Sequence, residues 1–178
     1  MERMSKAVMI SIRPKWCEKI CGGEKTIEVR KTRPKLDTPF KCYIYCTQSG
    51  VALGAWGKHG KVIGEFTCDR IYKIDKDNTD FLFKAGGLSV YKQAAEEKCG
   101  LRVAMTDDEL HGYLGHCWGY GWHISDLRIY DAPRELIEFE RPCECNECDA
   151  KWATECNACH EEGKIKRAPQ SWCYVEEG

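Results

Sequence analysis

The sequence lacks long apolar runs and a marked excess of charge of either sign. Its most apolar segments, Ala7 to Ile12 and Cys42 to Cys46, are far shorter than the ~20 residues that a membrane-spanning helix needs. Lys and Arg total 27 against 28 Asp and Glu, which leaves a net charge of −1. The whole-chain charge therefore indicates neither a nucleic acid nor an acidic membrane surface as partner. We expect no membrane association, and any binding of a charged partner must depend on a local group of side chains.

Two further sequence signals are absent. Residues 1–6 do not show the succession of charged, apolar and small residues that is typical of a secretory signal. No G-x-G-x-x-G or G-x-x-x-x-G-K-[ST] loop follows a predicted strand. We therefore expect a cytoplasmic protein without a doubly wound nucleotide-binding sheet. Its 178 residues are sufficient for one domain, or for one domain with a small insertion.

Cysteine, in contrast, is abundant, with 13 residues in the chain. A disulfide scaffold is typical of short secreted proteins, so we expect these thiols to stay reduced. Several lie singly among apolar residues, where a reduced cysteine behaves as a small buried hydrophobe. These are Cys17, Cys21, Cys42, Cys46, Cys68, Cys99 and Cys117.

Another group of cysteines forms two C-x-x-C pairs separated by seven residues: Cys145, Cys148, Cys156 and Cys159. Each pair can turn two thiolates toward one ion, and four thiolates complete the closed tetrahedral shell of structural zinc. The spacing therefore predicts a structural zinc without an open catalytic position. Because the intervening loop is short, Cys143 or His160 could replace one of the four ligands. Residues 143–163 contain few large apolar side chains, so metal would supply most of their order.

Hydrophobic periodicity predicts more strands than helices. The expected strands span residues 6–12, 26–30, 40–47, 61–75, 119–130 and 171–175. A short helix begins near Pro14 and ends at Gly22 and Gly23, and further helices span residues 89–98 and 106–114. Within residues 26–30, alternation assigns Ile27 and Val29 to the core face and the other three residues to a polar face. The order of these elements predicts an α+β fold with a mixed, curved sheet or small barrel.

The segment after the first helix carries the pattern G-x-K-x-x-E-x-R, formed by Gly23, Lys25, Glu28 and Arg30. A glycine-capped helix end lets the backbone approach a ligand closely. Lys25 offers a point charge suited to a phosphate or a carbonyl, and Glu28 and Arg30 share one strand face. These side chains could converge on one small polar group. Alternatively, Glu28 and Arg30 could form a structural ion pair that holds the loop.

This segment resembles the signature of the ASCH family, a branch of the PUA-like superfamily. The likeness extends to residues 121–127 and 169–175, which resemble segments of phage- and bacterium-borne members. It implies a PUA-like curved, mixed β-barrel with flanking helices over residues 1–142. Residues 143–163 would be a zinc-binding insertion with a cluster of cysteines, and residues 164–178 would supply the strand that completes the barrel.

The resemblance also implies a cleft beside the first helix that binds RNA, or a nucleotide or modified nucleoside. The expected ligand-binding residues are Gly23, Lys25, Thr26, Glu28, Arg30 and Trp122. Trp122 is a candidate for stacking on a base, since Gly119 and Gly121 would open space beside it.

Two other functions are compatible with the same residues. Some members resemble amidohydrolases that remove the acetyl group from acetylated cytidine with a Lys of this motif, a Thr and a Glu. Lys25 matches that Lys, whereas Glu28 stands where those enzymes have the hydroxyl-bearing residue. Lys25 and Glu28 are thus the candidate catalytic residues of an amidohydrolase or a ribonuclease. A catalytic acid would come from Glu96, Glu97, Asp107, Asp108 or Glu109. The remaining alternative is a module of a phage or defence system that binds a protein or a signal molecule.

Overall fold

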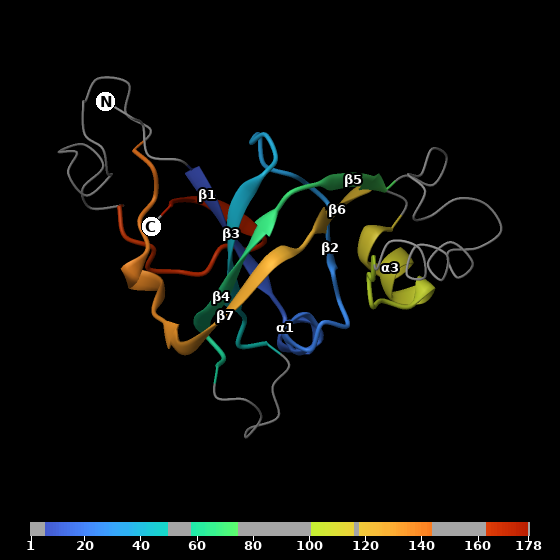
Figure 1. The fold of residues 1–178 in the computed structure, drawn as a ribbon, viewed down its shortest axis with the longest axis horizontal. Coiled ribbons are helices and arrows are strands. Elements are labelled where there is room, and N and C mark those ends of the chain that lie inside the picture. The colour runs from blue at the N-terminus through green and yellow to red at the C-terminus, as the bar shows by residue number, and fades with distance from the viewer. Residues whose placement is uncertain (1–5, 50–57, 75–100, 116–117, 144–162, 178) are drawn as a thin grey trace. The chain divides into compact units, whose positions relative to one another are not determined.

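The computed structural model of the chain describes residues 6–49, 58–74, 101–115, 118–143 and 163–177 (Figure 1). These residues form mainly strands, with two α-helices. The chain divides into two compact units. Unit 1 comprises Met1–Cys17, Phe40–Phe66 and Leu127–Gly178, and unit 2 comprises Glu18–Pro39 and Thr67–Asp126.

A five-stranded sheet with the order β7-β4-β3-β1-β8 organises unit 1. Its strands are β1 (Lys6–Ile12), β3 (Phe40–Cys46), β4 (Lys61–Cys68), β7 (Ser125–Arg134) and β8 (Trp172–Glu176), and the 3-10 helix η1 (Leu136–Glu138) follows β7. Strand β1 runs parallel to β3 and antiparallel to β8. Every residue of β1 after Lys6 is buried, so both faces of this central strand are covered, as its nearly continuous apolar sequence predicts.

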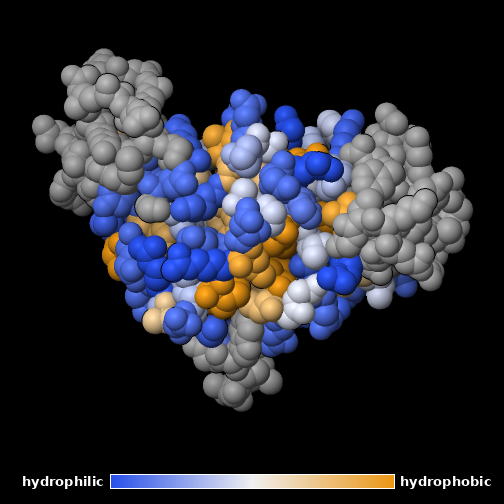
Figure 2. Space-filling model, in the orientation of Figure 1, coloured by the Kyte–Doolittle hydropathy of each residue, from blue (hydrophilic) through white to orange (hydrophobic). Residues whose placement is uncertain are grey.

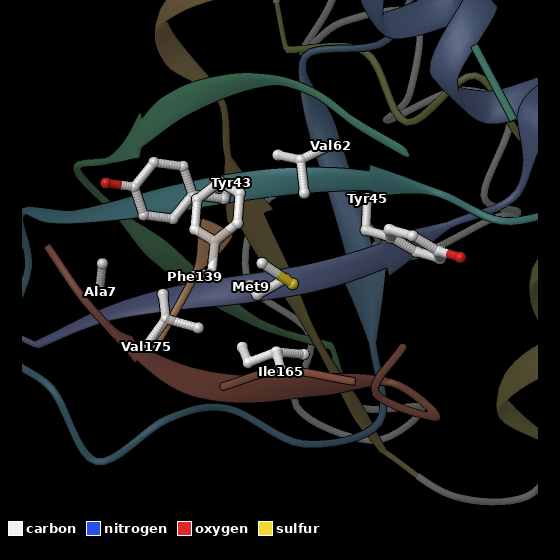
Figure 3. Close-up of a cluster of buried hydrophobic side chains, with 8 residues drawn as sticks. All are labelled: Ala7, Met9, Tyr43, Tyr45, Val62, Phe139, Ile165 and Val175. Carbon is white, nitrogen blue, oxygen red and sulfur yellow. The ribbon is translucent and has the colours of Figure 1, made fainter. Parts of the chain in front are cut away.

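One core of unit 1 is formed by side chains from the central strands and from two segments near the C-terminus. Its members are Ala7, Met9, Tyr43, Tyr45, Val62, Phe139, Ile165 and Val175. Figure 3 shows these side chains gathered around β1 and β3. The rings of Tyr43 and Phe139 meet edge to face, with their centroids 4.9 Å apart, an arrangement that the aromatic quadrupole favours.

A three-stranded antiparallel sheet with the order β2-β6-β5 organises unit 2. Its strands are β2 (Ile27–Arg30), β5 (Ile71–Ile74) and β6 (Gly119–His123), and helix α3 (Asp107–Leu114) precedes β6. Helix α3 begins with a capping box. The Thr106 hydroxyl accepts the Glu109 amide, and the Glu109 carboxylate accepts the Thr106 amide. This exchange satisfies two backbone donors at the helix start.

Helix α1 (Pro14–Cys21) leads into the G-x-K-x-x-E-x-R segment. Pro14 occupies its first position, where the missing amide proton costs no intrahelical hydrogen bond. The helix ends as predicted at Gly22 and Gly23. The Gly22 amide donates to Glu18 O at 2.9 Å, and Gly23 adopts a left-handed φ of +71°, which glycine adopts without steric cost.

The α+β class, both described helices and most strand positions are confirmed. The prediction of one unbroken strand over residues 61–75, and of another over 119–130, is wrong. The first divides at residues 69–70 into β4 and β5, and the second divides at Ile124 into β6 and β7. Because β4 and β7 are neighbours in one sheet while β5 and β6 are neighbours in the other, each predicted strand is shared between two sheets. Closure of the strands into a barrel, and the helix expected at residues 89–98, stay predictions; the latter lies outside the described residues.

Burial is confirmed for four of the five described cysteines that were predicted to be small buried hydrophobes. Cys17, Cys42, Cys46 and Cys68 are buried, Cys21 is half-buried, and the described cysteines form no disulfide. Burial raises the pKa of the Cys68 thiol to about 12, as desolvation disfavours a thiolate. Cys99 and Cys117 lie outside the described residues. Within the described part of the chain, no helix has the length and apolar character needed to span a membrane.

Both hydrophilic and hydrophobic side chains reach the surface of the described residues. Figure 2 shows that hydrophilic residues dominate the coloured part of the visible face and that some hydrophobic residues also reach the surface there. Large hydrophobic side chains that are exposed among the described residues are Tyr113, Trp118 and Ile137. Two of these three are aromatic residues of unit 2.

Candidate functional site

The loop between α1 and β2 is held by backbone hydrogen bonds on both sides. At the helix end, the amides of Glu24 and Lys25 both donate to Lys19 O, at 2.8 and 3.0 Å. At the strand end, the amides of Thr26 and Ile27 both donate to the carbonyl of Arg102. These bonds fix the direction in which the Lys25 side chain leaves the backbone.

Arg102 holds this loop with three of its groups. Besides its carbonyl, its amide donates to Thr26 Oγ1 at 2.7 Å, and its guanidinium donates to Gly23 O at 2.8 Å. The sequence analysis did not identify Arg102, because it acts mainly through backbone atoms and lies far from the motif in the chain. No residue pattern encodes such a contact.

Lys25, Glu28 and Arg30 form a buried charged group, here called the Lys–Glu–Arg cluster. Glu28 lies between the two cations: Arg30 Nη2 is 3.0 Å from its Oε1, and Lys25 Nζ is 3.4 Å from its Oε2. Lys25 Nζ also donates to the carbonyl of Val103 at 2.8 Å. The exposed fractions of Lys25, Glu28 and Arg30 are 2%, 5% and 7%. The sequence places Glu28 and Arg30 on a polar strand face, and the structure buries that face.

Within the cluster, two cations share the carboxylate of Glu28. Removal from water disfavours the charged form of a lysine, and burial is the largest influence that lowers the pKa of Lys25. The nearby Glu28 carboxylate opposes this effect, while Arg30 and Lys19 add to it. The cluster therefore has two chemical options. A protonated Lys25 leaves excess positive charge for an anion, and a neutral Lys25 is a base.

Trp122 occupies a different environment from the one expected of a stacking residue. It is fully buried, opposite Glu28 in β2 and Ile71 in β5. Gly119 and Gly121 do not open space beside it, because alternate residues of β6 face the other side of the sheet. A Cβ at Gly121 would lie 2.9 Å from the side chain of Ile27, so that space is filled. Trp122 presents no accessible ring face in this conformation, and its role as a ligand contact stays a prediction.

The structure describes some of the acids considered for catalysis. Glu109 belongs to the capping box of α3, and Asp108 is exposed on the same helix. Glu96 and Glu97 lie outside the described residues, as does the side chain of Asp107. The structure therefore assigns a structural role to Glu109 at the start of α3.

His123 belongs to a second polar contact that sequence reasoning did not identify. Its Nδ1 lies 2.6 Å from Asp69 Oδ1, and its amide donates to Arg70 O at 2.9 Å. These contacts link the end of β6 to the turn between β4 and β5. His123 pairs with Ile27, so it lies on the sheet face opposite Glu28 and Trp122.

The four predicted zinc ligands, Cys145, Cys148, Cys156 and Cys159, lie outside the described residues, as does His160. Cys143 is described and is half-buried. Among residues that the structure does describe, no three His, Cys, Asp or Glu side chains are grouped so that they could hold a metal ion. The ends of the cysteine-rich segment lie together: Glu140 and Lys164 form a β-bridge, and the Arg141 amide donates to Gly163 O at 2.8 Å.

No protein-family model and no curated protein sequence matches this chain. Solved structures do match its fold. The crystal structure of ASCH from Zymomonas mobilis aligns with a TM-score of 0.56 and 17% identity, over 99% of this chain and 90% of that one. A Tyr-to-Phe mutant of the same protein, ZmASCH, aligns with a TM-score of 0.57 and 17% identity, over 97% and 92% of the two chains. The chain therefore has the fold of an ASCH domain.

Proposed function

We propose that this ASCH-type domain binds RNA, or a nucleotide or modified nucleoside, at the Lys–Glu–Arg cluster. The observation that carries the proposal is the shared carboxylate: Lys25 and Arg30, both more than nine-tenths buried, contact the single carboxylate of Glu28. Buried charge is costly in a protein interior unless partners and hydrogen bonds offset the cost. A phosphate, or the electron-rich carbonyl edge of a base, would add a further negative partner for the two cations, and its attraction to them is stronger there than in water.

The approach to this cluster would be the loop that precedes β2. Gly22, Gly23 and Glu24 are exposed, while the adjacent Lys25 is buried. A Cβ placed on Gly23 would meet no described atom within 4 Å, so there is space for a ligand beside this backbone. The matching ASCH structures support the domain type, and this local geometry supports the choice of site.

The alternative, a hydrolase, is favoured by the lowered pKa of Lys25. Burial lowers its pKa, which increases the fraction of neutral amine available as a general base. In an amidohydrolase or a ribonuclease of this design, Glu28 would orient Lys25, and Lys25 would take a proton from the attacking water or hydroxyl group. The third interpretation, a module that binds a protein or a signal molecule, would use the same cluster for a carboxylate.

The test is a binding and turnover screen of the purified chain against labelled single-stranded RNA, free nucleotides and acylated nucleosides. The Lys25→Met variant removes one cation of the cluster, and Glu138→Gln, which alters an exposed ion pair with Arg134, is the matched control. We expect Lys25→Met to weaken binding and Glu138→Gln to leave it unchanged. Chromatography of the incubated ligands detects any product. Equal binding by the wild type and Lys25→Met would contradict the proposed site.

The salt dependence of binding separates the ligand classes. Each phosphate neutralised on a single strand lowers the logarithm of the binding constant by about 0.7 per tenfold increase in salt. RNA held through its phosphates would therefore bind more weakly as salt is added. A modified nucleoside without phosphate would bind almost equally at all salt concentrations.

We also propose a structural zinc in the segment that begins after Cys143. The donor set supports it, because two C-x-x-C pairs supply four thiolates, the ligands of closed zinc sites. The position of the segment supports it too. The backbone contacts of residues 140–141 with 163–164 close the ends of the segment, so the intervening chain is an insertion that can order around its own metal. Four thiolates would occupy the whole coordination shell, which assigns the metal to stability.

A further inference from the structure

Strand β6 and the residue before it carry aromatic side chains at alternate positions: Trp118, Tyr120 and Trp122. Alternate residues of a strand share one face of its sheet. Burial rises along this row, since Trp118 is 55% exposed, Tyr120 is half-buried and Trp122 is fully buried. The same face therefore runs from an exposed tryptophan to the buried surroundings of Glu28, which pairs with Trp122.

Cations flank this row on both neighbouring strands. Tyr120 pairs with Arg30 of β2 on one side and with Lys73 of β5 on the other. Lys73 is exposed, and its Nζ lies 4.6 Å from the centroid of the Trp118 ring. The Trp118 and Tyr120 rings are 6.3 Å apart and tilted by 41°. An exposed indole, a second ring and a lysine are thus gathered at one end of the sheet face that carries the cluster.

We infer that Trp118, Tyr120 and Lys73 form a stacking platform for single-stranded RNA, with a base on Trp118 and an adjacent phosphate at Lys73. The inference rests on the proposed function, and it identifies the ligand as a polynucleotide rather than a free nucleoside. Aromatic rings beside cations are the combination that binds single strands, because every base has a π-face and every nucleotide carries a phosphate. The occupant is identified by charge complementarity, since the charged residues that the register places beside Tyr120 are both cations.

The platform also explains how a chain with a net charge of −1 can hold a polyanion. Lys73 on the face of Trp118 forms a cation–π contact, which is worth little where solvent reaches it. Lys73 would exchange this contact for a phosphate when a base covers the indole. On the same sheet face, Arg30 extends the positive charge toward Lys25. An RNA strand on Trp118 would thus lie at the exposed end of the sheet face whose buried end carries the Lys–Glu–Arg cluster.

The experiment measures the fluorescence anisotropy of a labelled oligoadenylate and a labelled oligouridylate with the whole chain. Trp118→Ala should weaken binding of both by roughly 5- to 150-fold, which corresponds to the loss of one base–aromatic stack, and Trp118→Phe should retain most of the affinity. Ile137→Ala, at an exposed residue of unit 1, is the control. Circular dichroism and the urea midpoint should be unchanged, as Trp118 is largely exposed.

Lys73→Met tests the phosphate contact. It should reduce the slope of log binding constant against log salt by about 0.7, the value for one phosphate of a single strand. Lys6→Met is the matched control, because Lys6 also lies over an aromatic ring, 5.7 Å from the centroid of Tyr174, in unit 1. An unchanged slope in Lys73→Met would overturn the assignment of this lysine.

The outcomes separate the platform from the proposed function. Oligonucleotide binding that Lys25→Met weakens and Trp118→Ala leaves intact overturns the platform and keeps the cluster. Binding of free nucleosides without binding of oligonucleotides does the same. Binding that Trp118→Ala weakens and Lys25→Met leaves intact supports the platform and removes the cluster. If the chain binds a protein but neither oligonucleotide, and Trp118→Ala abolishes that binding, the RNA assignment is overturned.

Discussion

Replacement of Glu28 by Gln should destabilise the protein strongly, although the side chain keeps its shape. The change leaves Lys25 and Arg30 buried without their shared carboxylate. Removing one partner of a buried ion pair costs about 3–5 kcal/mol. The Gln amide can still accept a hydrogen bond from Arg30 on one side, but its NH₂ group cannot neutralise Lys25.

Deprotonation of Lys25 sets an upper limit on the share of this cost that comes from the lysine. If the ammonium loses its proton, the remaining penalty is the free energy of deprotonating a lysine of ordinary pKa, 10.5, at pH 7. That difference of 3.5 pH units, at about 1.4 kcal/mol per unit, gives about 5 kcal/mol. This limit agrees with the cost of about 3–5 kcal/mol given above. It also makes the cost depend on pH: because deprotonation of Lys25 becomes easier as the pH rises, the destabilisation by Glu28→Gln should shrink toward pH 10.5.

Urea unfolding at pH 7, followed by circular dichroism, measures the effect. With a slope of about 2 kcal/mol per M, the midpoint should fall by roughly 1.5–2.5 M. Glu138→Gln removes the carboxylate of an exposed pair with Arg134 and should cost less than about 1 kcal/mol. The double variant Lys25→Met/Glu28→Gln removes one excess cation and should recover much of the loss. A Glu28→Gln midpoint equal to that of Glu138→Gln would refute the argument that the cluster is a buried, charge-coupled group.

Three further predictions concern other parts of the chain. Burial lowers the pKa of Lys25 below its ordinary value of 10.5, so the unfolded chain binds the lysine proton more tightly than the folded chain. The free energy of unfolding of the wild type, relative to that of Lys25→Met, should therefore rise with pH between the lowered pKa and 10.5. Parallel pH profiles of the two proteins from urea unfolding would contradict this. Gly64→Ala places a Cβ 2.5 Å from Arg128 O and should cost about 1–3 kcal/mol. Gly112 lies in α3, and a Cβ there would meet no described atom within 4 Å outside the backbone of its own helix, so Gly112→Ala should stabilise the protein by up to about 1 kcal/mol. Melting temperatures measure both effects. Elemental analysis should find one zinc per chain, lost at low pH as thiolates are protonated and reduced in Cys145→Ser; metal-free protein prepared without chelators would refute the zinc proposal.

The sequence predicted the local structure around the candidate site well, because local chemistry determines it. Pro14 and the pair Gly22–Gly23 bound α1 as expected, since proline and glycine act through their own backbone geometry. The capping box of Thr106 and Glu109 likewise begins α3. In each case the residues that determine the element lie within one helical turn of its end.

The breaks in the two long predicted strands could not be read from the same patterns. Residues 61–75 and 119–130 have strand-forming residues throughout, and period-two alternation continues across a change of sheet. The divisions at residues 69–70 and at Ile124 depend on which strands are neighbours, and therefore on contacts between distant segments. The same reason explains the error at Gly119 and Gly121, whose space is filled by Leu114 and Ile27.

The spacing of the G-x-K-x-x-E-x-R motif follows from the same physical requirement whether its charges form a structural network or a binding site. Glu28 and Arg30 must alternate on β2 to share a face, and Lys25 must lie in the preceding loop to turn back toward Glu28. A purely structural network and a binding site therefore have the same sequence pattern. What separates them is the energetic account: well-packed apolar side chains of similar volume often stabilise a core as well as a buried ion pair does. Two buried cations around one carboxylate are a poor solution for stability alone, and they become a good one where an anionic ligand binds beside them.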